Sequence, residues 1–102
     1  MTITTKEGMN EIILSVEDRL DSITSPELQD KLISAFNEYA HVLLNFENLS
    51  YISSAGLRVL LLAQKTALGK KVSFTILNVS EEIMEVFNMT GFSYNLSINP
   101  AK

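Results

Sequence analysis

The chain has 102 residues, no cysteine and a net charge of −4, with 46% apolar and 20% charged residues. These values predict a single globular domain over residues 1–102, without disulfides or thiolate metal sites. The acidic balance and the absence of a basic stripe argue against nucleic-acid binding. No apolar run could cross a bilayer and no secretory signal pattern opens the sequence, so we expect a cytoplasmic protein without membrane insertion.

Two β-rich segments open the sequence, at residues 2–6 and 11–17. Gly8 lies between them and supports a turn, which predicts a hairpin. A helix is expected from about Ser25, because apolar side chains then recur at helical spacing. The predicted inner stripe of this helix consists of Leu28, Leu32, Ala35, Phe36 and Tyr39.

Two interpretations of the start of this helix stay open. Pro26 is favoured at a first helical position, which makes Ser25 the N-cap. Thr24 with Glu27 three residues later instead forms a capping-box pattern.

The rest of the chain continues to alternate strands and helices. The predicted elements are strand 41–46, helix 57–68 closed by Gly69, strand 71–77, helix 81–89 capped by Ser80 and stopped by Gly91, and strand 93–98. A hairpin pairs antiparallel, whereas strand–helix–strand units give parallel neighbours. The order β-β-α-β-α-β-α-β therefore predicts an α/β domain with a mixed sheet.

Helix 57–68 has two faces on a helical wheel. The face expected toward the sheet carries Leu57, Leu60, Leu61, Ala67 and Leu68, with Gln64 as an odd polar member, whereas Arg58, Leu62 and Thr66 point away.

Ser53 and Ser54 lie where a loop becomes the first turn of this helix. The amides there have no partner within the helix, and the helix dipole is positive at that end. A serine oxygen could cap those amides, or the amides could hold a phosphate on a serine. The residues alone leave both roles open.

Enzymatic chemistry finds little support in the sequence. His41 is the only histidine and opens a buried-looking strand, and neither a Gly-x-Ser-x-Gly elbow nor a Gly-rich nucleotide loop is present. Glu17, Asp18 and Asp21 fit a solvated strand end better than a metal site. We expect no catalytic, metal or cofactor-binding residue, and therefore no enzyme.

Three segments resemble the STAS domains that act as anti-sigma factor antagonists. Residues 44–57, LNFENLSYISSAGL, are similar to a strand and loop ending in Asp-Ser-Ser/Thr-Gly-Leu. Residues 86–92, VFNMTGF, resemble Leu-Phe-Asp-Met-Ser-Gly-Leu, and residues 19–21 resemble a Gly-Glu/Arg-Leu-Asp corner. The resemblance spans about residues 10–98 and implies a STAS-like fold over the single domain.

The resemblance also implies a partner switch. The phosphorylated serine of the family falls on Ser54, with Ser53 as the less favoured acceptor. The unphosphorylated domain would sequester an anti-sigma factor serine kinase of the histidine-kinase-like ATPase fold and so release a sigma factor. The kinase would end this binding by phosphorylation, and a metal-dependent serine phosphatase would restore it. No cofactor of the domain itself is implied.

The sequence departs from the family pattern at three positions. Ser53 stands where the family usually has Asp, Ala55 where it has Ser or Thr, and Asp18 where it has Gly. The partner surface that we expect comprises Asp21, Ser53, Ser54, Ala55, Gly56, Arg58 and Leu62. The alternative function is a non-switching STAS scaffold in a transport or signalling assembly, with the serines acting only as caps.

Overall fold

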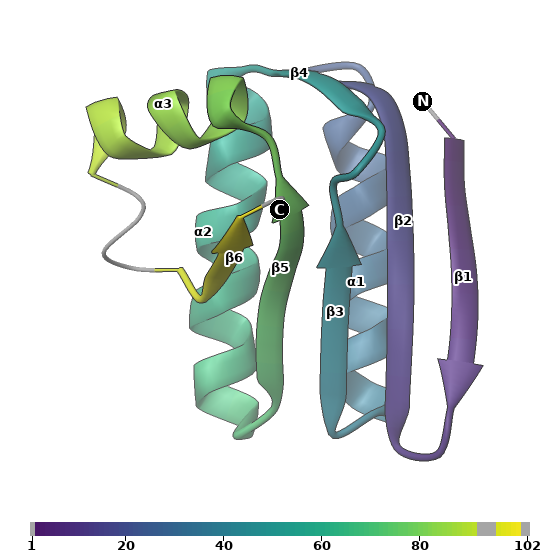
Figure 1. The fold of residues 1–102 in the computed structure, drawn as a ribbon. Helices are drawn as coiled ribbons and strands as arrows, with labels where there is room; N and C mark the ends of the chain where they lie inside the picture. Colours follow the sequence, from purple (N-terminus) through teal and green to yellow (C-terminus); the bar gives the residue numbers. More distant parts are fainter. Residues whose placement is uncertain (1, 92–95, 101–102) are drawn as a thin grey trace.

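The computed structural model describes residues 2–91 and 96–100. Its strands and helices alternate in the predicted manner, with one additional strand (Figure 1). The elements are β1 (Thr2–Gly8), β2 (Glu11–Leu20), α1 (Ser25–Glu38), β3 (His41–Asn45), β4 (Leu49–Ile52), α2 (Ser54–Lys70), β5 (Ser73–Val79), α3 (Glu81–Thr90) and β6 (Ile98–Pro100).

The sheet is mixed, as predicted. Its strand order is β1-β2-β3-β5-β6, and β4 pairs with the far end of β2. β1 and β2 form the predicted antiparallel hairpin, whereas β2–β3, β3–β5, β5–β6 and β2–β4 are parallel pairs. The carboxyl ends of the parallel strands β2, β3 and β5 therefore meet at one end of the sheet.

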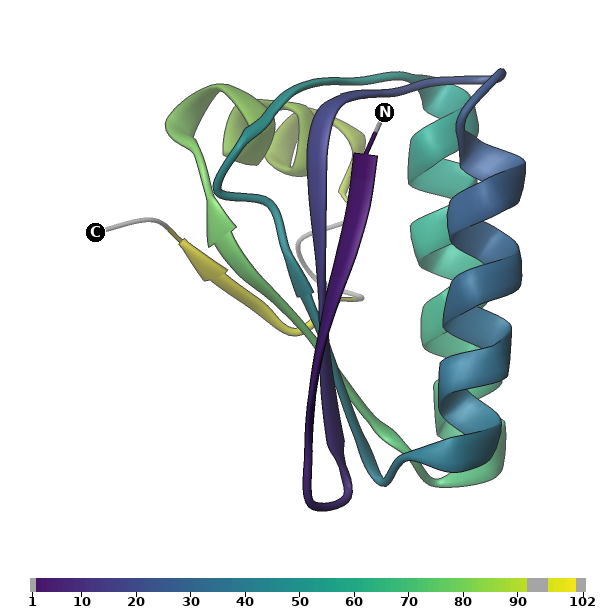
Figure 2. The same cartoon turned by 90° about the vertical axis from the view of Figure 1, so that its right-hand side faces the viewer.

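One face of the sheet is covered by α1 and α2, which stand side by side along it (Figure 2). α3 lies across the end of the molecule to which the parallel strands run (Figure 1). β2 buries Ile12, Leu14 and Val16, which belong to one core cluster with the buried stripe of α1. Between the layers, the Phe36 and Phe74 rings pack edge to face with centroids 5.5 Å apart. The predicted stripe of α1 is confirmed, with Tyr39 half-buried at its end.

The start of α1 agrees with the capping-box interpretation in the position of the cap but not in its bonding. The helix begins at Ser25 with Thr24 in the N-cap position, and the Thr24 side chain makes no capping bond. Its hydroxyl instead accepts from the Asp21 N–H, while the Ser25 hydroxyl donates to the Asp21 carbonyl. The preceding corner engages both hydroxyls, which a local pattern does not reveal.

The end of α2 and the faces of this helix differ in part from the predictions. α2 continues through Gly69 to Lys70 and ends on Lys71, whose φ of 59° is left-handed. Leu68 is 66% exposed rather than buried, whereas Val59 and Ala63 are buried.

Two strands also differ from the expectation, one by its presence and one by its position. Residues 49–52, predicted as loop, form β4. The final strand is at 98–100, while residues 93–95 of the predicted strand lie outside the described part. Among the described residues, no helix is long and apolar enough to cross a membrane.

Candidate functional site: the loop that opens α2

The candidate site lies at the end of the sheet to which the parallel strands run. Arg19 and Leu20 of β2 pair with Tyr51 and Ile52 of β4. Directly after this pair, the Ser53 N–H donates to the Leu20 carbonyl at 2.9 Å. The short strand β4 therefore fixes where α2 begins relative to the corner after β2.

Ser53 is the N-cap of α2, with an extended backbone at φ −96° and ψ 175°. Its Oγ accepts from the Gly56 N–H at 3.4 Å, longer than a typical N–H···O bond. Its carbonyl accepts from the Leu57 N–H at 3.0 Å. Gly56 is buried, and a Cβ on it would lie 2.8 Å from Ile52 Cγ1. The absence of a side chain at Gly56 thus allows the loop to pack closely on its neighbours. Ser53 is half-buried and caps the helix.

Ser54 occupies the first helical position and is exposed. As the first two helical residues, Ser54 and Ala55 have amides without an acceptor inside α2. No acidic residue lies in the first turn of α2 to offset the positive end of its dipole. Arg58 and Leu62 follow Ser54 at steps of four residues, so the three lie in one line on the helix. Arg58 is exposed and Leu62 is 43% exposed, as predicted.

Asp21 lies in the corner between β2 and α1 and is occupied by its own loop. Its Oδ1 accepts from the N–H groups of Ile23 at 3.0 Å and Thr24 at 3.1 Å. The Thr24 N–H bond, then the Ile23 N–H bond, lowers the pKa of this carboxyl, and Arg19 adds a smaller effect in the same direction. Asp21 therefore holds the corner in shape beside the 53–56 loop.

The same corner carries two features that the sequence interpretation left unassigned. The Arg19 guanidinium lies 4.2 Å from the centroid of the Tyr51 ring, and its Nε is 3.7 Å from Asp21 Oδ2. Asp18 has a left-handed φ of 75°, at a shift in the β2–β4 register. A glycine, as in the motif that this corner resembles, would adopt that backbone without strain.

A groove between α1 and α2 extends the site beyond the predicted residues. Its lining includes Ala55, Arg58 and Leu62 of α2 on one side, and Ser22, Pro26 and Gln29 on the other. Of these lining residues, the sequence analysis named Arg58 and Leu62 as outward side chains and Ala55 as part of the motif. The α1 side was missed because Ser22 and Pro26 suggest only a turn and a helix start.

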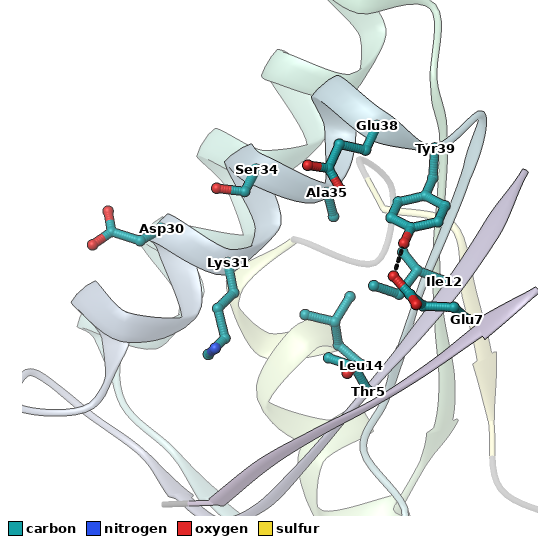
Figure 3. Close-up of a pocket in the computed structure, with 10 residues that line it drawn as sticks. All are labelled: Thr5, Glu7, Ile12, Leu14, Asp30, Lys31, Ser34, Ala35, Glu38 and Tyr39. Atoms are coloured by element: carbon teal, nitrogen blue, oxygen red, sulfur yellow. Dashed lines mark hydrogen bonds between the residues drawn. The ribbon is translucent and has the colours of Figure 1, made fainter.

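A second groove lies between α1 and the edge strand β1 (Figure 3). Its residues from α1 run from Asp30 to Glu38, so it lies toward the carboxyl end of this helix, away from Ser53 and Ser54. Its lining includes the charged side chains Glu7, Asp30, Lys31 and Glu38. The Tyr39 hydroxyl donates to the Glu7 carboxylate across it, and this bond raises the pKa of Tyr39 to about 12. No predicted site residue lies in this second groove.

His41 and the serines are at opposite ends of the sheet. His41 opens β3 and pairs with Glu11 at the start of β2, whereas the serines follow the strand beside Leu20 at its end. The structure therefore does not bring them together as a nucleophile and base. Within the described residues, no three His, Asp or Glu side chains are grouped to hold a metal ion.

Comparisons with known proteins identify the family to which this fold belongs. A model of the STAS domain family matches residues 1–101. An anti-sigma-B factor antagonist of Staphylococcus epidermidis is 33% identical over 87 residues, which cover 84% of this chain and 81% of the relative. The chain therefore belongs to the STAS domain family. Within that family its sequence groups with the anti-sigma factor antagonists.

Solved structures agree with this assignment at the level of the fold. The anti-sigma factor antagonist SpoIIAA in its unphosphorylated form matches with a TM-score of 0.78 at 17% identity, over 99% of this chain and 90% of that one. The phosphorylated form of SpoIIAA, a Bacillus cell fate determinant, matches with a TM-score of 0.75 at 18% identity, over 95% and 90%. The predicted STAS-like fold is confirmed.

Proposed function

We propose that this chain is a cytoplasmic anti-sigma factor antagonist whose binding to an anti-sigma factor serine kinase is switched at Ser54. The observation that carries the proposal is the place of Ser54, exposed at the first position of α2. The 33% identity to an anti-sigma-B factor antagonist supports the same class of function. In the unphosphorylated state the chain sequesters the kinase, and the sigma factor is released.

The environment of the two serines favours Ser54 as the acceptor. Ser53 is half-buried and its Oγ already accepts from the Gly56 N–H, whereas Ser54 is exposed. The kinase transfers the γ-phosphoryl group of ATP to the Ser54 Oγ, which loses its proton, and ADP leaves. A metal-dependent phosphatase then hydrolyses the ester with water, returning serine and inorganic phosphate.

The proposed phosphate acts on the docking surface rather than on the fold. It adds nearly two negative charges and three acceptor oxygens beside Arg58. The free amides at the start of α2 and the Arg58 guanidinium, four residues on, are suited to bind it. A kinase surface that packs on this part of α2 then meets a bulky, solvated dianion, and its binding is lost.

The test uses the anti-sigma factor kinases of the host organism. Each is incubated with the chain and Mg-ATP, and peptide mass spectrometry locates the phosphate. We expect phosphate on Ser54 in the wild type and in Ser53→Ala, and none in Ser54→Ala. Binding to the kinase should be tight before phosphorylation and lost after it.

Two outcomes would overturn the proposal. Phosphate on neither serine removes the switch. A stable complex with a non-kinase partner, with the same affinity before and after phosphorylation, supports the scaffold function instead.

A further inference from the structure

We infer that the kinase-docking surface extends from Ser54 across the α1–α2 groove to Ile23, which acts as its apolar anchor. This inference rests on the proposed function and deepens it. It adds Ile23 and the α1 side of the groove to the partner surface expected from the sequence. The occupant is the anti-sigma factor kinase, which would present apolar side chains to this surface.

Ile23 is largely exposed, and hydrogen bonds hold its backbone in place. Its side chain is 85% exposed in the corner between β2 and α1. Asp21 Oδ1 accepts from the N–H of Ile23 and of Thr24, and the Thr24 Oγ accepts from the Asp21 N–H at 2.9 Å. A side chain on so well-bonded a turn loses little backbone freedom on binding, which suits an anchor.

The corner that carries Ile23 is continuous with the proposed switch. Ser22, its neighbour in sequence, lines the same groove as Ala55 and Arg58. The Leu20 carbonyl, three residues before Ile23, accepts from the Ser53 N–H. A partner that covers Ser54 and the groove therefore also reaches the corner.

The low charge of this surface favours a partner surface that also carries few charges. Of the eight described residues that line the α1–α2 groove, only Arg58 is charged. The groove at the other end of α1 has four charged side chains among its ten described lining residues. Depletion of charge is typical of the buried centre of a protein interface, whereas a charged groove stays solvated. The α1–α2 groove and Ile23 thus form the part of this surface suited to being covered.

The anchor and the switch contribute to different kinetic constants. As an anchor, Ile23 takes no part in the phosphoryl transfer, so it binds the kinase equally in the ground state and the transition state. Loss of such uniform binding raises KM and leaves kcat unchanged. A general loss of the fold or of the acceptor geometry would lower kcat as well.

The experiment compares Ile23→Ala with Met9→Ala, using the kinase that phosphorylates the wild-type chain. Met9 is a matched control because it is 94% exposed in the β1–β2 turn, at the opposite end of β2. Truncating an interface anchor costs about ten-fold or more in affinity. We expect Ile23→Ala to raise both Kd and KM about ten-fold, with an unchanged kcat, and Met9→Ala to bind like the wild type.

The outcomes separate this inference from the proposed function. Wild-type affinity in Ile23→Ala, or equal losses in both variants, overturns the anchor while leaving the switch in place. A loss in Ile23→Ala through kcat alone also overturns it. If no anti-sigma factor kinase binds the wild-type chain and it self-associates through this surface instead, both the proposed function and the anchor are rejected.

Discussion

At the scale of single residues, Gly56 sets how closely α2 approaches the end of β2. A Cβ at this position would lie 2.9 Å from Leu20 Cγ and 3.0 Å from the Leu20 carbonyl oxygen. The alanine would gain helix propensity, but the backbone contact cannot move aside cheaply. We expect Gly56→Ala to lower the free energy of unfolding by about 1–3 kcal/mol, measured by urea denaturation.

Gly69 provides the matched control in the same helix. A Cβ there would meet no atom within 4 Å, so Gly69→Ala should stabilise the chain by up to about 1 kcal/mol. Equal changes in the free energy of unfolding for the two substitutions would show that the close approach at Gly56 does not affect stability.

Caps could be predicted from the sequence only where they depend on local chemistry. Ser80 accepts from the Ile83 N–H, and Gly91 ends α3 with a φ of 77°, as expected. The start of α1 could not be predicted because the corner around Asp21 takes the Thr24 and Ser25 hydroxyls for its own bonds. A capping pattern states what a side chain can bond, whereas the tertiary fold decides which bond it makes.

At the scale of elements, the corner between β2 and α1 depends on one ionised carboxylate. The bonds from the Thr24 and Ile23 N–H groups lower the Asp21 pKa below its ordinary 3.8. A lowered folded-state pKa contributes stability that is present above pH 3.8 and lost as pH falls through the folded value. Asp21→Asn should therefore be less stable than the wild type at neutral pH, and the difference should shrink below pH 3.8.

Urea unfolding from about pH 7 down to about pH 3 measures this difference. Asp30→Asn is the control, because it removes an exposed carboxylate from the middle of α1. A gap between Asp21→Asn and the wild type that stays constant down to the lowest pH would contradict the assigned role of the carboxylate.

The helices and strands with strong periodicity were predictable, and those shaped by their neighbours were not. The stripe of α1 follows directly from its apolar spacing. β4 has only four residues, and it exists because β2 extends past its predicted end to pair with it. Leu68 lies on the expected inner face by spacing, yet it is exposed in the last turn of α2 beside the buried Ala67.

At the scale of the whole molecule, the order of hairpin and crossovers is sufficient to predict a mixed sheet with parallel central strands. This topology brings the end of β2 and the start of α2 together, which places Asp21 near the serines. The groove and the exposure of Ile23 could not be predicted, because they depend on how α1 and α2 stand relative to each other. Spacing along the chain defines the faces of a helix but not its distance from the next one.

The proposed switch requires that the whole molecule tolerates a phosphate at position 54. Because the positive end of α2 has no acidic residue in its first turn, a dianion there should stabilise the fold by about 0.5–2 kcal/mol. The helix end lowers the second phosphate pKa below its unfolded value of about 6, so the gain is present above that pH and is lost as pH falls through the folded value.

Chains carrying phosphoserine at position 54 or at position 34 test this expectation by thermal unfolding at about pH 7.5 and pH 5. Ser34 is exposed within α1, away from any helix start, and serves as the control. Phosphoserine 54 should raise Tm by several degrees at the higher pH, and most of that rise should be lost at the lower. A fall in Tm at both pH values would mean that phosphorylation loosens the domain. Loss of kinase binding would then result from destabilisation of the fold and not from a change in the surface around Ser54.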